Sequence, residues 1–228
     1  DDDTEAATDG FEADVLTMSV EVAHVFAGMG ASLVEDATGY AGYRLDTEGA
    51  VGFSVNVEDG SDDPSNFYLA IVQNIATGDR YVGVEFELVE ASLVGITDLT
   101  FEVGATVMVN WAEEGLDRLN WYQAAVNETD GRLPEFNAKL TNELDFLISG
   151  SMTLGVLDFF YASGSFALEK SSATVTVTDG ETPEAGVDVE LLTIGATVSH
   201  AFAGVNGPYW TDADKDGEVD DGETSDAA

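Results

Sequence analysis

The clearest chemical pattern in the sequence lies near the end of the chain, in the twelve residues 212–223. Acidic residues occupy positions 1, 3, 5, 7, 9 and 12 of this stretch, glycine occupies position 6 and valine position 8. A hard divalent cation takes about 6–8 oxygen ligands, and alternate positions of a tightly turning loop point inward. The spacing therefore predicts a Ca²⁺ site.

The predicted ligands have distinct roles. Glu218 supplies its backbone carbonyl, Glu223 closes the coordination sphere with both carboxylate oxygens, and Gly217 allows the sharp bend. Without the ion these acidic side chains repel one another, so we expect calcium to order the loop, with a dissociation constant on the order of 10⁻⁴ to 10⁻³ M. The full predicted set is Asp212, Asp214, Asp216, Glu218, Asp220 and Glu223.

This loop resembles the calcium loops of EF-hands and dockerins, and the resemblance covers only its twelve positions. The flanks depart from that family, because Asn206-Gly-Pro-Tyr-Trp210 cannot form an incoming amphipathic helix and residues 224–228 are too few for an outgoing one. The loop is more similar to a structural loop between β units of giant, acidic, secreted bacterial repeat proteins. The segments Gly186-Val-Asp-Val-Glu-Leu191 and 163–170 also resemble such tandem repeats.

Two further acidic clusters are weaker cation candidates. They are Asp59, Asp62 and Asp63 around Gly60, and the initial run Asp1-Asp2-Asp3. Neither has a spacing that distinguishes a metal site from a solvated turn.

No catalytic constellation is recognisable in the sequence. The chain has two His, seven Lys and Arg and no Cys, and it lacks a Gly-x-Ser-x-Gly elbow, a phosphate-binding loop and a His-Glu-x-x-His motif. Carboxylate pairs suited to glycoside hydrolysis are everywhere, so none is singled out. We predict that the protein is not an enzyme and that Ca²⁺ is its cofactor.

The charge balance excludes several partners. The 228 residues hold 45 Asp and Glu against 7 Lys and Arg, a net charge of −38. Such a surface repels phosphates, which excludes nucleic acid and docking on anionic membranes. No membrane insertion is expected, because Asp158 and several Gly and Ser interrupt the apolar stretch 147–168. The start at Asp1, without Met or an apolar leader, suggests a mature product or an excised piece.

Alternation of apolar and polar residues recurs along most of the chain and predicts half-buried β-strands. Asp-Gly turns such as Asp59-Gly60 and Asp179-Gly180 separate these segments. The stretch 111–147 interrupts the alternation and fits one or two short helices. We predict an all-β fold, either an elongated antiparallel β-sandwich or a β-sheet repeat architecture with a calcium-loop insertion. The apolar sets expected to share one face include Val82-Val84-Phe86-Leu88, Met18-Val20-Val22-His24-Phe26 and Ile194-Ala196-Val198-His200-Phe202.

An internal repeat organises the sequence. Residues 10–28 align without gaps with residues 186–204, and 8 of the 19 positions are identical. Such a unit is stabilised by stacking on its neighbours, strand beside strand. His24 and His200 fall at the same position of the two copies. An equivalent pair suggests either ligands or a pH switch, but a histidine bonded to a neighbouring strand is the simpler interpretation.

These features predict six regions. They are an acidic linker (1–9), a first β-repeat region (10–110), an irregular or short helical insertion (111–147), a second β-repeat region (148–210), the calcium loop (211–223) and a short linker (224–228).

The predicted function is structural: a calcium-stabilised extracellular repeat protein that forms or decorates a filament, sheath, surface layer or adhesin, with other copies of itself as partners. One alternative is a carbohydrate- or ligand-binding β-sandwich module of a cell-surface adhesin. Another is an outer-membrane protein whose strands turn one face to lipid, although the strands lack consistent aromatic ends. The candidate stacking residues for a carbohydrate are Trp111, Trp121, Tyr122, Tyr209 and Trp210.

Overall fold

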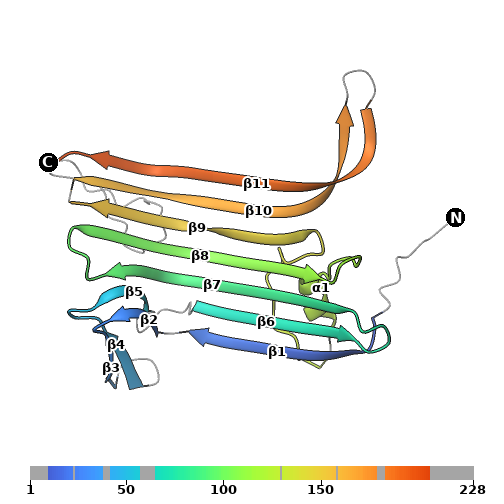
Figure 1. The fold of residues 1–228 in the computed structure, drawn as a ribbon, viewed down its shortest axis with the longest axis horizontal. Coiled ribbons are helices and arrows are strands. Elements are labelled where there is room, and N and C mark those ends of the chain that lie inside the picture. Colours follow the sequence, from blue (N-terminus) through green and yellow to red (C-terminus); the bar gives the residue numbers. More distant parts are fainter. Residues whose placement is uncertain are drawn as a thin grey trace.

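A computed structural model describes residues 10–22, 24–37, 42–56, 65–128, 130–157, 159–178 and 183–205. These residues form a mostly β structure with a single short helix, which confirms the predicted all-β antiparallel class (Figure 1). Of the two predicted arrangements, the described residues form an open sheet, accompanied only by a small two-stranded one.

Nine strands make up the large sheet. They are β1 (Ala13–Val22), β2 (His24–Met29), β5 (Val51–Asn56), β6 (Ser65–Asn74), β7 (Arg80–Val94), β8 (Leu99–Ala112), β9 (Leu144–Val156), β10 (Phe160–Thr178) and β11 (Pro183–Ala203). The small sheet pairs β3 (Ser32–Glu35) with β4 (Tyr43–Asp46), and the helix is α1 (Trp121–Asn127).

The large sheet follows the path β1-β6-β7-β8-β9-β10-β11, and every neighbouring pair is antiparallel. β5 pairs with the part of β7 that lies beyond β6, and β2 pairs with β5. β5 and β6 therefore share one row of the sheet, and β1 and β2 share the row outside it. The two margins are the β1–β2 row and β11 (Figure 1).

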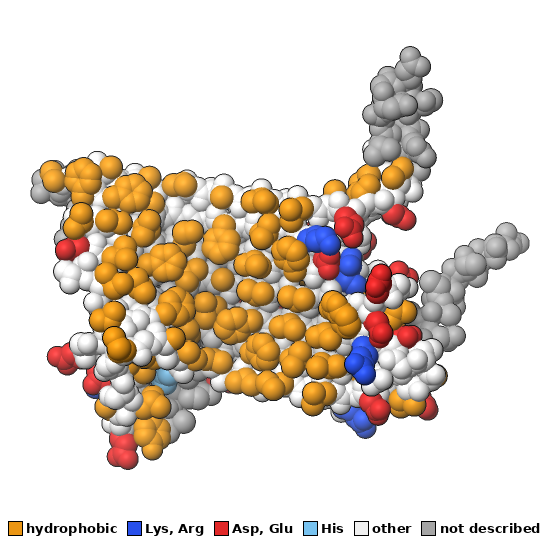
Figure 2. All heavy atoms as spheres, in the orientation of Figure 1, with side chains coloured by type: hydrophobic (Ala, Val, Ile, Leu, Met, Phe, Trp, Pro, Cys, Tyr) orange, Lys and Arg blue, Asp and Glu red, His pale blue; other side chains and the backbone are white. Residues whose placement is uncertain are grey.

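Side-chain alternation gives the sheet two unlike faces. The front face carries Val82, Val84 and Phe86, whose cross-strand partners on β8 are Trp111, Val109 and Val107. Figure 2 shows this face covered with apolar side chains, whereas acidic and basic side chains gather at the ends of the strands. The predicted alternation of β7 is thus present in the structure, and its apolar partners on β8 alternate in the same way.

Alternation fails at one predicted place in each outer row. Met18, Val20 and Val22 share the front face, but His24 and Phe26 lie on the back face, because β1 ends at Val22 and β2 begins a new register at His24. The prediction that all five share a face is therefore wrong. A register shift of one residue moves every later side chain to the opposite face.

The same correction applies to β11. Its register with β10 shifts between Val198 and His200, so Ile194, Ala196 and Val198 lie on the front face whereas His200 and Phe202 lie on the back. The period-2 pattern of the sequence continues unchanged across this bulge, because an inserted residue leaves no mark on it.

The main core lies on the back face, under the segment that joins β8 to β9. This segment, residues 113–128 and 130–143, is called the cap below. Nine buried residues form the cluster: Ala70, Val72, Tyr81, Met108, Trp121, Phe136, Leu140, Leu144 and Leu147. The cap thus seals one end of the back face.

Asn110 joins the cap to the sheet. Its side chain is fully buried, and its Nδ2 donates to the backbone carbonyls of Leu119 and Thr141, both at 2.7 Å. Its Oδ1 accepts a hydrogen bond from the indole Nε1 of Trp121 at 2.9 Å. One amide therefore pairs with both carbonyls and the indole N–H, and the Thr141 carbonyl also accepts from the backbone N–H of Leu144.

Trp121 fits because its neighbour on the sheet has no side chain. A Cβ on Gly83 would lie 2.7 Å from two atoms of the indole ring, closer than carbon atoms can approach. Gly83 is the cross-strand partner of Asn110, so the indole lies flat over one residue and bonds to the next. Phe136 closes the site from outside, with its ring centroid 5.6 Å from that of the indole.

Arg118 fastens the cap to β9 and β10. Its guanidinium donates to the backbone carbonyls of Asn142 and Glu143 and to the hydroxyl of Ser172, and it lies 3.6 Å from the Asp145 carboxylate. Lys170 binds the same carboxylate from β10. Two of the seven basic residues thus pair with one half-buried carboxylate of a strongly acidic protein.

We expect Asn110→Leu to be strongly destabilising. The substitution leaves the Trp121 N–H and the Leu119 carbonyl without partners, whereas the Thr141 carbonyl keeps the backbone N–H of Leu144; each buried group left unpaired costs about 1–3 kcal/mol. The free energy of unfolding, measured by urea titration, should fall by about 3 kcal/mol or more. The exposed Asn142→Leu is the matched control and should change it by less than about 0.5 kcal/mol. Equal effects of the two substitutions would contradict this role for Asn110.

Candidate functional site

The predicted calcium loop lies outside the described residues. Its ligands Asp212, Asp214, Asp216, Glu218, Asp220 and Glu223 all belong to the undescribed end of the chain, as do Tyr209 and Trp210. The weaker candidates Asp59, Asp62 and Asp63 and the run Asp1-Asp2-Asp3 are also outside it. Among the described residues, no three His, Asp or Glu side chains are grouped so that they could hold a metal ion.

The candidate carbohydrate-stacking residues are split by burial. Trp121 has no exposed surface and belongs to the core, so it cannot stack on a ligand, and that assignment is corrected. Trp111 lies on the front face and is 48% exposed, whereas Tyr122 on α1 is 41% exposed. Because the cap packs on the back face, Trp111 and the cap do not build one aromatic platform.

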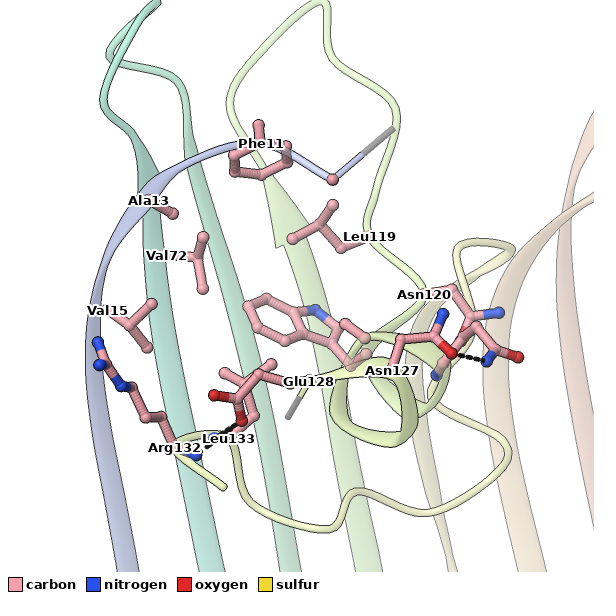
Figure 3. A pocket seen from close by; sticks show the side chains of 14 residues that line it. Phe11, Ala13, Val15, Val72, Leu119, Asn120, Asn127, Glu128, Arg132 and Leu133 are labelled. Carbon is pink, nitrogen blue, oxygen red and sulfur yellow. Dashed lines mark hydrogen bonds between the residues drawn. The ribbon is translucent and has the colours of Figure 1, made fainter. Parts of the chain in front are cut away.

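A pocket of about 760 Å³ opens between β1, β6 and the cap (Figure 3). Its apolar wall includes Phe11, Val15, Val72, Leu119 and Leu133. Sequence reasoning missed this pocket, because it depends on how the cap crosses β6 and not on any local motif.

The polar side chains at the pocket rim have structural partners. Asn120 accepts a hydrogen bond from the backbone N–H of Gln123 and caps the start of α1, and the Gln123 amide donates to Asn127. The Glu128 carboxylate accepts from the backbone N–H groups of Arg132 and Leu133 at 2.6 and 3.0 Å (Figure 3). These groups shape the cap, and no nucleophile and base face each other across the pocket.

Glu85 is the one acidic side chain buried beneath the cap among the described residues. It is 5% exposed and accepts a hydrogen bond from the backbone N–H of Asn137 at 2.8 Å. Burial raises the pKa of its carboxyl above the ordinary value, the Asn137 hydrogen bond opposes that rise, and the nearby charge of Glu87 adds to it. A carboxylate paired with a single N–H suits a structural contact that pH can loosen.

The margins of the sheet are a second candidate site, because one side of each outer row has no strand beside it among the described residues. In the described part of the chain, β11 pairs only with β10, so the opposite side of this 21-residue strand has no strand beside it. Residues 191–203 contain no Asp, Glu, Lys or Arg, although one residue in five of the whole chain is acidic. Leu192, Ile194 and Val198 are 63%, 73% and 69% exposed. Proteins normally protect an exposed apolar edge with charge, proline or a covering segment.

The two repeated histidines are separated by the whole width of the sheet. His24 lies in the β1–β2 row and His200 in β11, six rows away. At about 4.8 Å per row they are roughly 29 Å apart. Within one chain they therefore cannot bind the same ion. Among the described residues, both ring nitrogens of His24 are buried without a hydrogen-bond partner, so the expected bond to a neighbouring strand is not found at that position.

Comparisons with protein-family models, curated proteins and solved structures find no match for this chain. The single helix of the described residues, α1, is too short to cross a bilayer.

The raised pKa of Glu85 predicts a pH-dependent stability. Because the carboxyl holds its proton more tightly in the folded state, its contribution falls as pH rises from the ordinary glutamate pKa of 4.5 through the folded value. Glu85→Gln should therefore raise the melting temperature at pH 7.5, and the gain should shrink towards pH 5. Exposed Glu114→Gln removes the same charge and is the control. A Glu85→Gln loss that is equal at both pH values would contradict the prediction.

Proposed function

We propose that this protein is a structural, calcium-stabilised extracellular repeat protein, which forms or decorates a filament, sheath, surface layer or adhesin by associating with copies of itself. The observation that carries the proposal is the open sheet, whose two outer rows share a repeated sequence and lack an outer partner within the described residues. Backbone N–H and C=O groups along such a row are a ready template for another strand.

The distribution of side chains supports association of copies. Exposed apolar residues cover the front face, and the charged ones lie at its ends (Figure 2). Association of copies removes apolar surface from water, at about 25 cal/mol per Å². Acidic strand ends then come together, so the assembled form needs cations that the separate chains do not.

Calcium provides those cations in this proposal. The loop 212–223 follows β11 in the sequence, and in this proposal an ion bound there orders the chain that continues from that strand. The remaining acidic residues form a solvated surface whose mutual repulsion is screened by dissolved ions. The expected millimolar affinity of the loop suits an extracellular calcium concentration.

The proposal is tested on the full chain at constant ionic strength. With calcium, sedimentation velocity and negative-stain microscopy should reveal assemblies, and excess chelator should shorten or dissolve them and increase protease sensitivity. Asp212→Ala combined with Glu223→Ala should reproduce the effect of chelation in the presence of calcium, because both ends of the coordination sphere are lost.

Glu113→Ala combined with Glu114→Ala is the charge-matched control, since it removes two exposed carboxylates from the cap. This control should assemble with the calcium dependence of the parent chain. Assembly size, melting temperature and protease resistance that stay the same in excess chelator would refute the calcium-dependent function.

A further inference from the structure

The two margins of the sheet are structurally equivalent, beyond their shared sequence. A shift of 176 residues places the β1–β2 row on β11. β1 ends at Val22 and β2 resumes at His24, and the register of β11 shifts between Val198 and His200, the same two positions of the repeat. In both rows the first residue of this pair lies on the front face and the second on the back.

Side-chain packing repeats as well. The ring of Phe26 lies over Gly28, where a Cβ would come within 2.8 Å of its Cζ. The ring of Phe202 lies over Gly204 in the same way, at 3.2 Å. The His-x-Phe-Ala-Gly motif thus forms one local structure at both margins, with a phenyl ring stacked along its own strand on the glycine two residues later.

The outer side of β11 therefore corresponds to the inner side of the β1–β2 row, which is already paired. In that row β1 pairs with β6 and β2 pairs with β5. The six rows from β1–β2 to β10 are called the sheet unit below. β11 resembles the first row of such a unit in three ways: its register shifts at the same position, its side chains lie on the same faces, and its phenyl ring packs on the same glycine.

Resting on the proposed function, we propose that β11 is the first row of a following sheet unit: its outer side binds, antiparallel, the β5–β6 row of that second copy and takes the place of that copy's own β1–β2 row. The β1–β6 and β2–β5 ladders give the register. Residues 189–198 face a strand equivalent to β6, and residues 200–205 face a strand equivalent to β5.

The partner strand must have a glycine at one position. The Phe26 ring reaches across the ladder, so that a Cβ on Gly52 of β5 would also lie 2.8 Å from its Cζ. Gly52 is the cross-strand partner of Gly28, the equivalent of Gly204. A strand that pairs with the end of β11 therefore needs glycine opposite Gly204 to accept the Phe202 ring, and β5 of a second copy supplies it.

A two-unit fusion tests the proposal directly. Residues 1–204 are joined to residues 29–228, so that Gly204 precedes Met29 as Gly28 does in the natural chain. Hydrogen exchange is measured by mass spectrometry in excess chelator, and the natural chain is the reference. Amides of residues 189–204 should exchange roughly tenfold more slowly or better in the fusion, because an edge strand becomes an interior one.

Two variants of the second unit separate specific pairing from general stabilisation. Gly52→Ala brings a Cβ to 2.5 Å from the Ala27 carbonyl oxygen in the ladder that the proposal copies, so it should abolish the added protection. Gly104→Ala has its nearest neighbour at 3.6 Å and should preserve it. A folded fusion whose residues 189–204 exchange as in the natural chain would overturn the proposal.

A second experiment uses a synthetic peptide and does not require the fusion to fold. The peptide Ser65–Asn74 is added to the natural full chain in chelator, and it should slow exchange in residues 189–198. The same peptide N-methylated at alternate amides, which cannot form a ladder, should not. Absence of protection, or equal protection by both peptides, counts against the proposal. Calcium-dependent assembly without either protection would leave the proposed function standing and remove only this pairing.

Discussion

The stability of the sheet depends on how Asn110 is buried. A β-strand that carries a primary amide in its buried back face is unstable unless every polar atom of that amide is used. Here the amide binds the two ends of the cap and the indole of Trp121, so the cap cannot lift without breaking all three bonds. The main hydrophobic cluster exists only while the cap is in place. The rest of the sheet extends from this closed corner.

Much of the β structure could be predicted from alternation, because Val, Phe and acidic residues alternate with period 2 in β7 and β8. The faces of the outer rows could not, since the register changes after Val22 and after Val198 reverse the pattern without altering composition. Trp121 shows the same limit: an aromatic residue near a helix start has one sequence signature whether it is exposed or covers a glycine. Gly83 is the one residue in the sequence that could have indicated the burial of Trp121, but only once it is known that the indole packs on Gly83.

The open margin of β11 is a feature that local sequence motifs do not predict. The calcium loop is recognisable because its ligands are neighbours in sequence, and it stays a prediction. The open margin of β11 follows from the strand order of the whole sheet, which no local motif records, and only the repeat indicated that both margins matter. The uncharged stretch 191–203 is the further sign that composition alone could have supplied, since it stands out in a chain of net charge −38.

The number of rows in the sheet unit has a geometric consequence. Neighbouring rows are antiparallel throughout, and six is an even number, so the β1–β2 row and β11 run in the same direction. Units added through β11 would all point the same way, and a chain of them would have two chemically different ends, one finishing in a β1–β2 row and the other in β11. Such a polymer has a built-in direction, so addition at its two ends would occur at different rates and an anchor specific for one end would orient the whole fibre.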